Sequence, residues 1–470
     1  MLWRAIKSFA IIVFILMILM PVALMNTEPD SISKIDNRVL AKFPFGEGAP
    51  KGDLTRNIES YVQDRIGFRE KMILAFTMLN DKLFGKMVHP TYCYGKDGYV
   101  FFKMGANVRY GEFHETFADM VKKIQTYCEE RDIPFLFAFD PAKTSVLTQY
   151  LPRGANYDSS WVKTFSAALD KRGVNYVDNT GLLIQKTQNG EAVFNQKFDA
   201  GHWNDLGAFY GVNNMLSAMH DKLSTVHVNR MDEFNITRRL ETSLPVSTFP
   251  IHEYVPVFSF KNLSEENYTK LYIDEVERNP RFRGFNYFVN NERLSQGSPK
   301  VLVFQGSYMN GKGNKYLRNS FGEYVAVHNY QNVINFPYYF NIFKPDYVLF
   351  EVTEYTFNNG YFDMKRMKSM NLNPPLADVL SNNDKQLVHR ALNTSEIKVE
   401  EGKMLAKITW TGGPKGGFVW LLLGDEEFDM IRSHDKADTY YVTVPASTYQ
   451  GALQKLKIAA AESKQIVIYE

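Results

Sequence analysis

Apolar residues follow two different periods along the chain, and these periods predict helices and strands in turn. Apolar residues at helical spacing predict helices over residues 57–85, 113–130, 159–171, 205–221 and near 314–321. Short apolar runs predict strands at residues 134–140, 174–178, 301–304, 324–328 and 347–353, and residues 95–102 predict a turn that leads into another strand. Strands that alternate with helices are typical of an α/β fold with a parallel sheet covered on both faces.

Two regions depart from this alternation. Residues 222–300 are polar and show no clear period, so we interpret them as an excursion within one α/β domain at residues 56–378. From residue 385 to residue 470, short strand-like runs separated by turns predict a β-sandwich-like C-terminal domain; the runs are residues 404–410, 418–423, 439–444, 453–458 and 465–469. A chain of 470 residues is long enough for two such domains.

The first 25 residues predict a transmembrane signal-anchor. Arg4 and Lys7 precede an uncharged apolar run at residues 9–25, whose length lies at the lower end of the roughly 17–25 residues that span a bilayer. A cleaved signal peptide is the alternative, although this run ends in a poor cleavage site. Because the positive charge precedes the run, we expect a single pass through the cell membrane with the bulk of the protein extracytoplasmic. Residues 26–55 are polar, rich in Pro and Gly, and are interpreted as a tether.

Composition argues against several classes of function. The chain has 54 Lys+Arg, 52 Asp+Glu and no basic run after residue 10, so we expect no nucleic-acid partner. The sequence lacks metal-ligand spacing among its histidines, a Cys-x-x-Cys pair and a phosphate-binding glycine loop, so we expect no metal and no cofactor. Cys93 and Cys128 are the only cysteines; export would permit a disulfide, and two reduced, buried thiols are the alternative.

The candidate chemistry lies in two short segments. FDAGHWNDLGA at residues 198–208 places Asp199 and His202 three residues apart, in a turn of small residues ahead of a helical pattern. VLVFQGSYMNG at residues 301–311 is a buried-type strand that runs into Ser307. A serine at the carboxyl end of a parallel strand lies where α/β sheets bind ligands, and a histidine held by a carboxylate can take its proton. We therefore predict acyl transfer through a serine ester, with Ser307, His202 and Asp199 as catalytic residues.

Each segment also has a plainer interpretation. The alternative for Asp199 and His202 is a helix cap beside a satisfied core polar group, and Gly-Ser turns after strands are common. Their joint occurrence at strand-to-helix junctions favours a shared site on one rim of the sheet. Backbone N–H groups around Ser307, aided by Asn310, would then hold the oxyanion.

Further segments resemble one protein family. They are DNRVLAKFP at residues 36–44, YVQDRIGFRE at 61–70, FDPAKTSVLTQYLP at 139–152 and KPDYVLFEVTEYTF at 344–357. With the two catalytic segments, they resemble the SGNH-hydrolase-like O-acetyltransferases that include the alginate O-acetylation proteins AlgJ and AlgX, also called DHHW proteins. Asp199 and His202 precede Ser307, which is the permuted order of that group. Gln305 and Tyr355 depart from the pattern, since Tyr355 stands where the family has an arginine.

The resemblance implies an SGNH-like, flavodoxin-like sheet in permuted order and an O-acetyltransferase that acts on a secreted or cell-wall polysaccharide, such as an exopolysaccharide. It also implies a partner, a multispanning membrane-bound O-acyltransferase (MBOAT-like) that exports the acetyl group. Candidate substrate-binding residues are Trp203, Lys143 and Tyr355. Packing is the alternative for Trp203, and a solvated strand-end lysine is the alternative for Lys143.

Other functions stay open from the sequence. A carbohydrate esterase or deacetylase would use the same triad with water as acceptor. A non-catalytic scaffold of an acetylation complex would account for the unusual Gln305 and Tyr355. A DltD-like role in D-alanylation is a weaker alternative. The C-terminal β-domain is expected either to bind the glycan or to be purely structural.

Overall fold

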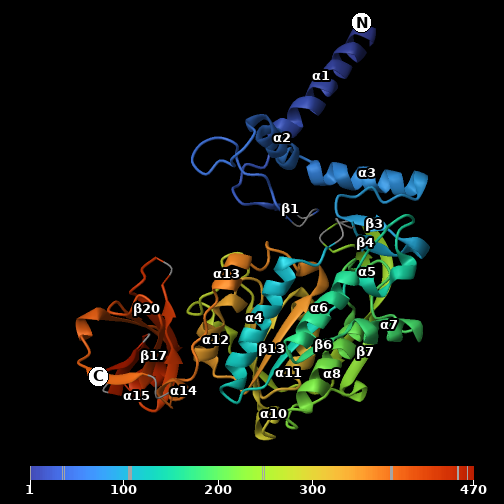
Figure 1. The fold of residues 1–470 in the computed structure, drawn as a ribbon. Helices are drawn as coiled ribbons and strands as arrows, with labels where there is room; N and C mark the ends of the chain where they lie inside the picture. The colour runs from blue at the N-terminus through green and yellow to red at the C-terminus, as the bar shows by residue number, and fades with distance from the viewer. Residues whose placement is uncertain are drawn as a thin grey trace.

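The computed structural model describes residues 2–33, 35, 38–103, 108–245, 247, 249–381, 385–433, 435–452, 455–462 and 464–470. A long N-terminal helix projects from one end of the molecule, an α/β domain occupies the centre, and a β-rich C-terminal region lies beside it (Figure 1). Asp36 and Asn37 of the predicted opening motif, His434, and residues 453–454 at the start of a predicted strand lie outside the described residues.

A seven-stranded sheet forms the centre of the α/β domain, in the order β6-β5-β13-β11-β12-β10-β9. Its strands are β5 (Phe135–Asp140), β6 (Tyr176–Asp178), β9 (Glu265–Asn267), β10 (Phe285–Asn290), β11 (Lys300–Gln305), β12 (Glu323–His328) and β13 (Tyr347–Thr353). The first five strands in this order pair in parallel, whereas β10 pairs antiparallel with both β12 and β9. The predicted α/β fold is confirmed, but the sheet is mixed rather than wholly parallel.

The antiparallel edge comes from the region interpreted as a polar excursion. Besides β9 and β10, this region forms a long hairpin of β7 (Phe234–Ser243) and β8 (Pro250–Phe260). Phe234 and Phe258 of the hairpin pack on Phe209 of α8 (Asp205–His220), with ring centroids 5.9 and 6.0 Å apart. Each hairpin strand buries only scattered residues, so neither has the continuous apolar run that would have predicted a strand.

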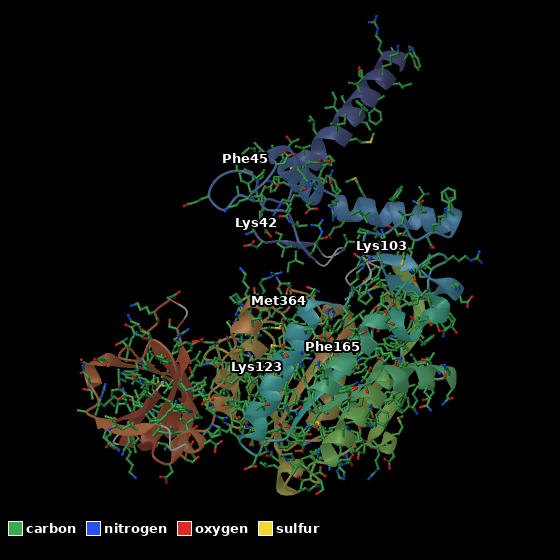
Figure 2. All side chains as sticks on the ribbon, in the orientation of Figure 1. Lys42, Phe45, Lys103, Lys123, Phe165 and Met364 are labelled. Carbon is green, nitrogen blue, oxygen red and sulfur yellow. The ribbon has the colours of Figure 1, made fainter. Side chains whose placement is uncertain are left out.

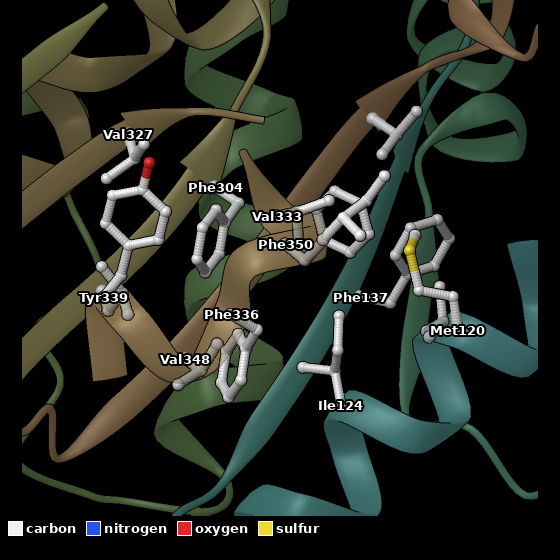
Figure 3. Close-up of a cluster of buried hydrophobic side chains, with 14 of the residues drawn as sticks. Met120, Ile124, Phe137, Phe304, Val327, Val333, Phe336, Tyr339, Val348 and Phe350 are labelled. Atoms are coloured by element: carbon white, nitrogen blue, oxygen red, sulfur yellow. The ribbon is translucent and has the colours of Figure 1, made fainter. Parts of the chain in front are cut away.

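Alternate residues of the central strands face opposite sides of the sheet, and each side has its own core. Leu302 and Phe304 join the core under α4 (Glu112–Glu129), α6 (Ser160–Lys171) and α12 (Phe336–Phe343). Figure 3 shows part of this core, where Phe350 lies between Phe304 and Phe137, and Met120 of α4 lies on the side of Phe137. Val301 and Val303 join the core on the other side, under α8 and α11 (Asn314–Arg318). The sheet is therefore covered on both faces, as predicted.

The helix predicted at residues 57–85 is two helices, α2 (Leu54–Arg65) and α3 (Arg69–Phe84). The break lies at Gly67, whose N–H donates to the Pro21 carbonyl at 2.8 Å near the end of α1 (Leu2–Ala23). A Cβ atom at Gly67 would lie 2.8 Å from the Leu24 Cβ, so only glycine permits this approach. The contact with α1 divides the helix, and the spacing of apolar residues in the sequence does not predict this contact.

The C-terminal region contains two packed sheets. One has the order β14-β22-β21-β17-β18 and the other β15-β16-β20-β19. The strands are β14 (Gln386–Arg390), β15 (Ile397–Glu401), β16 (Leu405–Trp410), β17 (Phe418–Leu423), β18 (Glu426–Asp429), β19 (Ile431–Arg432), β20 (Tyr440–Pro445), β21 (Leu456–Ala461) and β22 (Gln465–Tyr469). Ile408 of one sheet and Leu421 of the other share a core, as in a β-sandwich. The division of the chain into separate domains stays a prediction.

The two cysteines are both free thiols. Cys93 lies on β3 (Tyr92–Tyr94) and is partly buried, whereas Cys128 near the end of α4 is fully buried. Burial raises the pKa of both thiols, so neither is activated toward oxidation. Of the two alternatives left open by the sequence, the structure has the reduced one.

Candidate active site

Ser307 follows the carboxyl end of β11, the middle strand of the seven-stranded sheet. The backbone enters a helical turn at Ser307 and continues through a π-turn at Met309–Gly313 into α11. The N–H groups of a first helical turn lack partners within the helix. The fold therefore places the serine hydroxyl beside backbone donors at the edge of the sheet where α/β proteins bind ligands.

Asp199 and His202 lie in the loop that precedes α8. Asp199 has φ of 59°, in the left-handed region, and its Oδ1 accepts the His202 N–H at 3.1 Å. The cap of α8 is Asn204, whose side chain accepts the Gly207 N–H at 3.0 Å. Because another residue caps the helix, the helix-cap alternative for Asp199 is wrong.

The three predicted catalytic residues are in hydrogen-bond contact. The distance from His202 Nδ1 to Asp199 Oδ1 is 2.7 Å, and from His202 Nε2 to Ser307 Oγ is 2.9 Å. Burial raises the pKa of Asp199, but hydrogen bonds from the His202 ring and from backbone N–H groups outweigh it and hold this pKa below its usual value. The carboxylate is therefore ionised and accepts the proton of Nδ1. This tautomer leaves Nε2 as an acceptor for the serine hydroxyl.

Tyr355 also contacts the predicted catalytic residues. It lies in the short helical turn Glu354–Thr356, which follows β13. Its hydroxyl lies 3.0 Å from Ser307 Oγ and 3.3 Å from His202 Nε2. Burial raises the pKa of the Tyr355 hydroxyl, which keeps it protonated. Because Ser307 gives its only proton to His202, we assign Tyr355 as the donor to Ser307 Oγ. The sequence predicted Tyr355 as a substrate-binding residue, and the structure places it against the predicted nucleophile.

A buried carboxyl pair lies beneath the serine. Glu351 Oε2 accepts the Gly306 N–H at 2.6 Å, which holds the backbone just before Ser307. Burial raises the pKa of Glu351 to about 7 and also raises that of Asp140 beside it. Neither residue was predicted from the sequence as part of a site. A carboxylate inside the apolar run YVLFEVT was the available signal.

Asn310, the predicted oxyanion residue, lies one turn beyond the serine. Its side-chain oxygen accepts from Gln305 Nε2 at 2.6 Å, and its N–H donates to the Gly306 carbonyl at 3.1 Å. Gln305 is in turn held by its oxygen, which accepts from the Tyr324 hydroxyl at 2.6 Å. The departure at Gln305 is thus part of a satisfied hydrogen-bond chain that orients the Asn310 amide.

Lys143 is buried rather than solvated, which corrects the strand-end alternative. Its Nζ donates to the Val100 carbonyl at 2.9 Å and to the Gln196 carbonyl at 3.3 Å. Burial lowers the pKa of Lys143 to about 7. The side chain therefore ties the loop that carries Asp199 to the strand at Val100, rather than reaching into solvent for an anionic polymer.

Glu253 of β8 holds the same loop and was not predicted from the sequence. Its carboxylate accepts three consecutive backbone N–H groups, those of Gln196 (2.6 Å), Lys197 (2.9 Å) and Phe198 (2.5 Å). Hydrogen bonds to a charged acceptor are worth roughly 1.5–3 kcal/mol each. A lone glutamate in a polar region carries no local signal of this role, which depends on the hairpin reaching back to the loop.

Trp203 is fully buried, and its Nε1 donates to the Tyr308 carbonyl at 3.1 Å. No ring face is open to stack on a sugar, so the prediction of substrate contact is corrected in favour of packing. The bond links the loop of His202 directly to the residue after Ser307. Trp203 therefore holds the two predicted catalytic segments together.

A pocket of about 140 Å³ opens beside Tyr355. It is lined by Phe102, Lys103, Ala142, Lys143, Thr144, Tyr157, Ala200, Gly201 and Tyr355. Lys103 lies between the N-terminal helices and the α/β domain (Figure 2). The pocket thus adjoins both the catalytic loop and the N-terminal region. In the described part of the chain, no group of three or more His, Cys, Asp or Glu side chains is placed to hold a metal ion.

Over part of its length the chain resembles an SGNH-hydrolase-like protein. The family described as "SGNH hydrolase-like domain, acetyltransferase AlgX" matches the chain over residues 93–245, a span that contains Asp199 and His202. The predicted resemblance to the acetyltransferases of the AlgJ and AlgX group is thereby confirmed. Comparison with curated proteins gives no match.

Several solved structures are similar to the chain. The structure of Bacillus cereus PatB1 with a sulfonyl adduct has 15% identity and a TM-score of 0.44, and covers 58% of this chain and 96% of that one. The O-acetyltransferase domain of Pseudomonas putida AlgJ has 16% identity and a TM-score of 0.41, and the match covers 60% of this chain and 100% of that one. Pseudomonas aeruginosa AlgX has 13% identity and a TM-score of 0.40, and the match covers 75% of this chain and 86% of that one.

Proposed function

We propose that this chain is a membrane-anchored, extracytoplasmic O-acetyltransferase that acetylates a secreted or cell-wall polysaccharide through Ser307, His202 and Asp199. The observation that carries the proposal is the pair of contacts His202 Nδ1–Asp199 Oδ1 (2.7 Å) and His202 Nε2–Ser307 Oγ (2.9 Å). Asp199 and His202 lie within residues 93–245, the span that resembles an acetyltransferase domain. An assembled triad supports an enzyme over a non-catalytic scaffold.

The reaction proceeds in two halves. His202 Nε2 takes the proton of Ser307 as Oγ bonds to the acetyl carbonyl carbon, and the leaving group of the donor departs with that proton. A sugar hydroxyl of the acceptor then gives its proton to Nε2 and attacks the acetyl-serine carbonyl carbon. Nε2 returns that proton to Ser307 Oγ as the serine ester bond breaks, which leaves the sugar ester and the free serine. Asp199 stabilises the imidazolium in both halves. Backbone N–H groups from Ser307 onward, the Asn310 amide and the Tyr355 hydroxyl are the available oxyanion donors.

Tyr355→Phe is expected to lower kcat by about 10²-fold with little change in KM, the magnitude typical for loss of one oxyanion donor. The hydroxyl lies 3.0 Å from Ser307 Oγ, so it can shift to the oxyanion that forms beside that atom. Steady-state kinetics with an acetyl ester would measure the change. Tyr254→Phe, on the exposed part of β8, is the matched control. An unchanged kcat in Tyr355→Phe would exclude the hydroxyl from the reaction.

The N-terminal helix supports attachment to the membrane. Residues Ile6–Ala23 of α1 have a mean hydropathy of 2.5 and are exposed along the helix, as in an anchor or a signal sequence. Pro21 and Leu24 pack on Gly67, so cleavage after the apolar run would remove contacts that the body of the protein makes. This supports a retained anchor over a cleaved signal. Since the apolar run at residues 9–25 has no polar residue to carry an acyl donor, an MBOAT-like exporter is the partner that we propose.

The acceptor distinguishes a transferase from an esterase. We expect purified protein given a soluble acetyl ester and an oligosaccharide to form acetylated sugar, with less acetate released than without the sugar. The acetyl-serine partitions between water and a sugar hydroxyl, and a bound sugar excludes water. Mass spectrometry of the sugar and an acetate assay would measure both products. Rapid acetate release with no acetylated sugar would instead assign a carbohydrate esterase.

A further inference from the structure

Helix α3 has a continuous apolar stripe on its outer surface. The stripe consists of Met72, Phe76, Leu79 and Leu83, which are 48%, 55%, 54% and 62% exposed. Their spacing of four, three and four residues places them on one face of the helix, one above another. We call these four residues the outer stripe. A row of large apolar side chains facing solvent along a whole helix marks a surface that contacts something apolar.

The opposite face of α3 is fixed to the body of the protein. Leu74 and Met78 pack against a small core, and the Thr77 hydroxyl donates to the Val88 carbonyl at 2.7 Å. Asp81 on the same face accepts from the Tyr94 hydroxyl at 2.9 Å. At 100° per residue, this face lies roughly 180° from the outer stripe. The outer stripe therefore points directly away from the body.

The start of α3 is held at the end of the membrane anchor. Gly67 donates to Pro21 at 2.8 Å, and the Arg65 carbonyl accepts the Asn26 N–H at 2.8 Å. The Arg65 guanidinium also donates to the Glu28 carbonyl at 2.7 Å. In Figure 1, α3 runs across the direction of α1, with the α/β domain on the side of α3 away from α1. Phe45, also exposed, lies beside α2 near the base of α1 (Figure 2).

We propose that α3 lies in the plane of the membrane interface, with the outer stripe inserted among the lipid acyl chains and headgroups. The inference rests on the proposed anchoring of α1. If α1 spans the bilayer, the surface of that bilayer lies where α1 ends, which is where α3 begins. An amphipathic helix at this level buries its apolar face by lying on the membrane. Lys71 and Lys82, both exposed, flank the outer stripe and can extend their ammonium groups to lipid phosphates.

This arrangement would hold the active site close to the membrane. Leu74 and Met78 of α3 pack on the same small core as Ala200, which lies between Asp199 and His202 in the catalytic loop. This small core thus connects α3 to the catalytic loop. Two attachments, the anchor and α3, would set both the distance and the orientation of the site relative to the bilayer, whereas a single tether would leave the orientation free. An acetyl group delivered from a membrane partner then has a short path to Ser307.

Environment-sensitive fluorophores on single introduced cysteines test the placement in the full-length chain, reconstituted in phosphatidylcholine–phosphatidylglycerol nanodiscs. Phe76→Cys and Leu79→Cys report the outer stripe, and Ile12→Cys reports the anchor. Leu294→Cys is the matched control, an exposed leucine on α10 (Asn291–Ser295) at the far end of the molecule (Figure 1). The unsubstituted chain gives the background from Cys93 and Cys128. Quenching by brominated phospholipid measures contact with lipid, and quenching by iodide measures contact with water.

We expect the labels at Phe76 and Leu79 to emit to the blue of the label at Leu294, to be quenched by brominated lipid and to resist iodide. Iodide quenching at both stripe positions, with Ile12 still in lipid, would overturn the placement of α3 while leaving the anchor intact. Protection from both quenchers would overturn it in favour of a protein contact, such as a second copy of the chain. Iodide quenching at Ile12 itself would refute the proposed anchoring, and the placement of α3 with it.

Discussion

Ser307→Ala is expected to abolish reaction of the protein with a serine-directed sulfonyl reagent and to lower acyl transfer by about 10⁶-fold, the magnitude found when a triad serine is removed. The reason is that Oγ is the atom from which His202 can take a proton and which then forms the ester. Because Ser307 is only partly buried, loss of one hydroxyl should leave the melting temperature nearly unchanged. Intact-mass spectrometry after labelling, kinetics and a melting curve provide the three readouts.

The matched control for this prediction is Ser217→Ala, an exposed serine on α8 whose hydroxyl donates only to the carbonyl one turn back. Labelling of that variant should equal labelling of the unsubstituted chain. Labelling that persists at full stoichiometry in Ser307→Ala would place the nucleophile elsewhere. Loss of labelling together with loss of fold would be visible in the melting curve.

Asp199→Asn is expected to slow acyl transfer by roughly 10⁴-fold, as in the best-studied triad, while the protein stays folded. An asparagine would offer its amide to His202 Nδ1 and favour the tautomer whose Nε2 carries the proton, so Nε2 could no longer accept from Ser307. His202→Ala should be comparably damaging. The double variant should be little worse than the worse single variant, because the two residues act as one unit. Kinetics of the three variants would measure this non-additivity.

Asp53→Ala separates a structural effect from a catalytic one. Asp53 caps α2 by accepting the Thr55 N–H at 2.8 Å, so its loss should cost about 1 kcal/mol of stability and leave turnover unchanged. If Asp199→Asn behaves in the same way, with a small loss of stability and full activity, the triad assignment is refuted.

The residues that hold the catalytic segments in place could not be predicted from the sequence. Lys143 and Glu253 hold the catalytic loop, and Glu351 holds the backbone before Ser307. Their partners are backbone groups that lie far away in the sequence, so the residues leave no periodic pattern. Trp203 gave a local signal, an aromatic side chain beside a catalytic motif, but this signal is the same for packing as for sugar binding. Only its burial separates the two.

The sequence by itself determined the central strands, most of the helices and the apolar N-terminal helix, because burial imposes a period of 2 or 3.6 residues on local sequence. It also singled out Asp199, His202 and Ser307 through short motifs at element ends. The tertiary structure alone decided the antiparallel edge of the sheet, the break at Gly67 and the contact of Tyr355 with Ser307. These features depend on which distant segments meet. Contacts between distant segments are determined by the packing of the whole chain, and the local pattern of apolar and polar residues does not predict them.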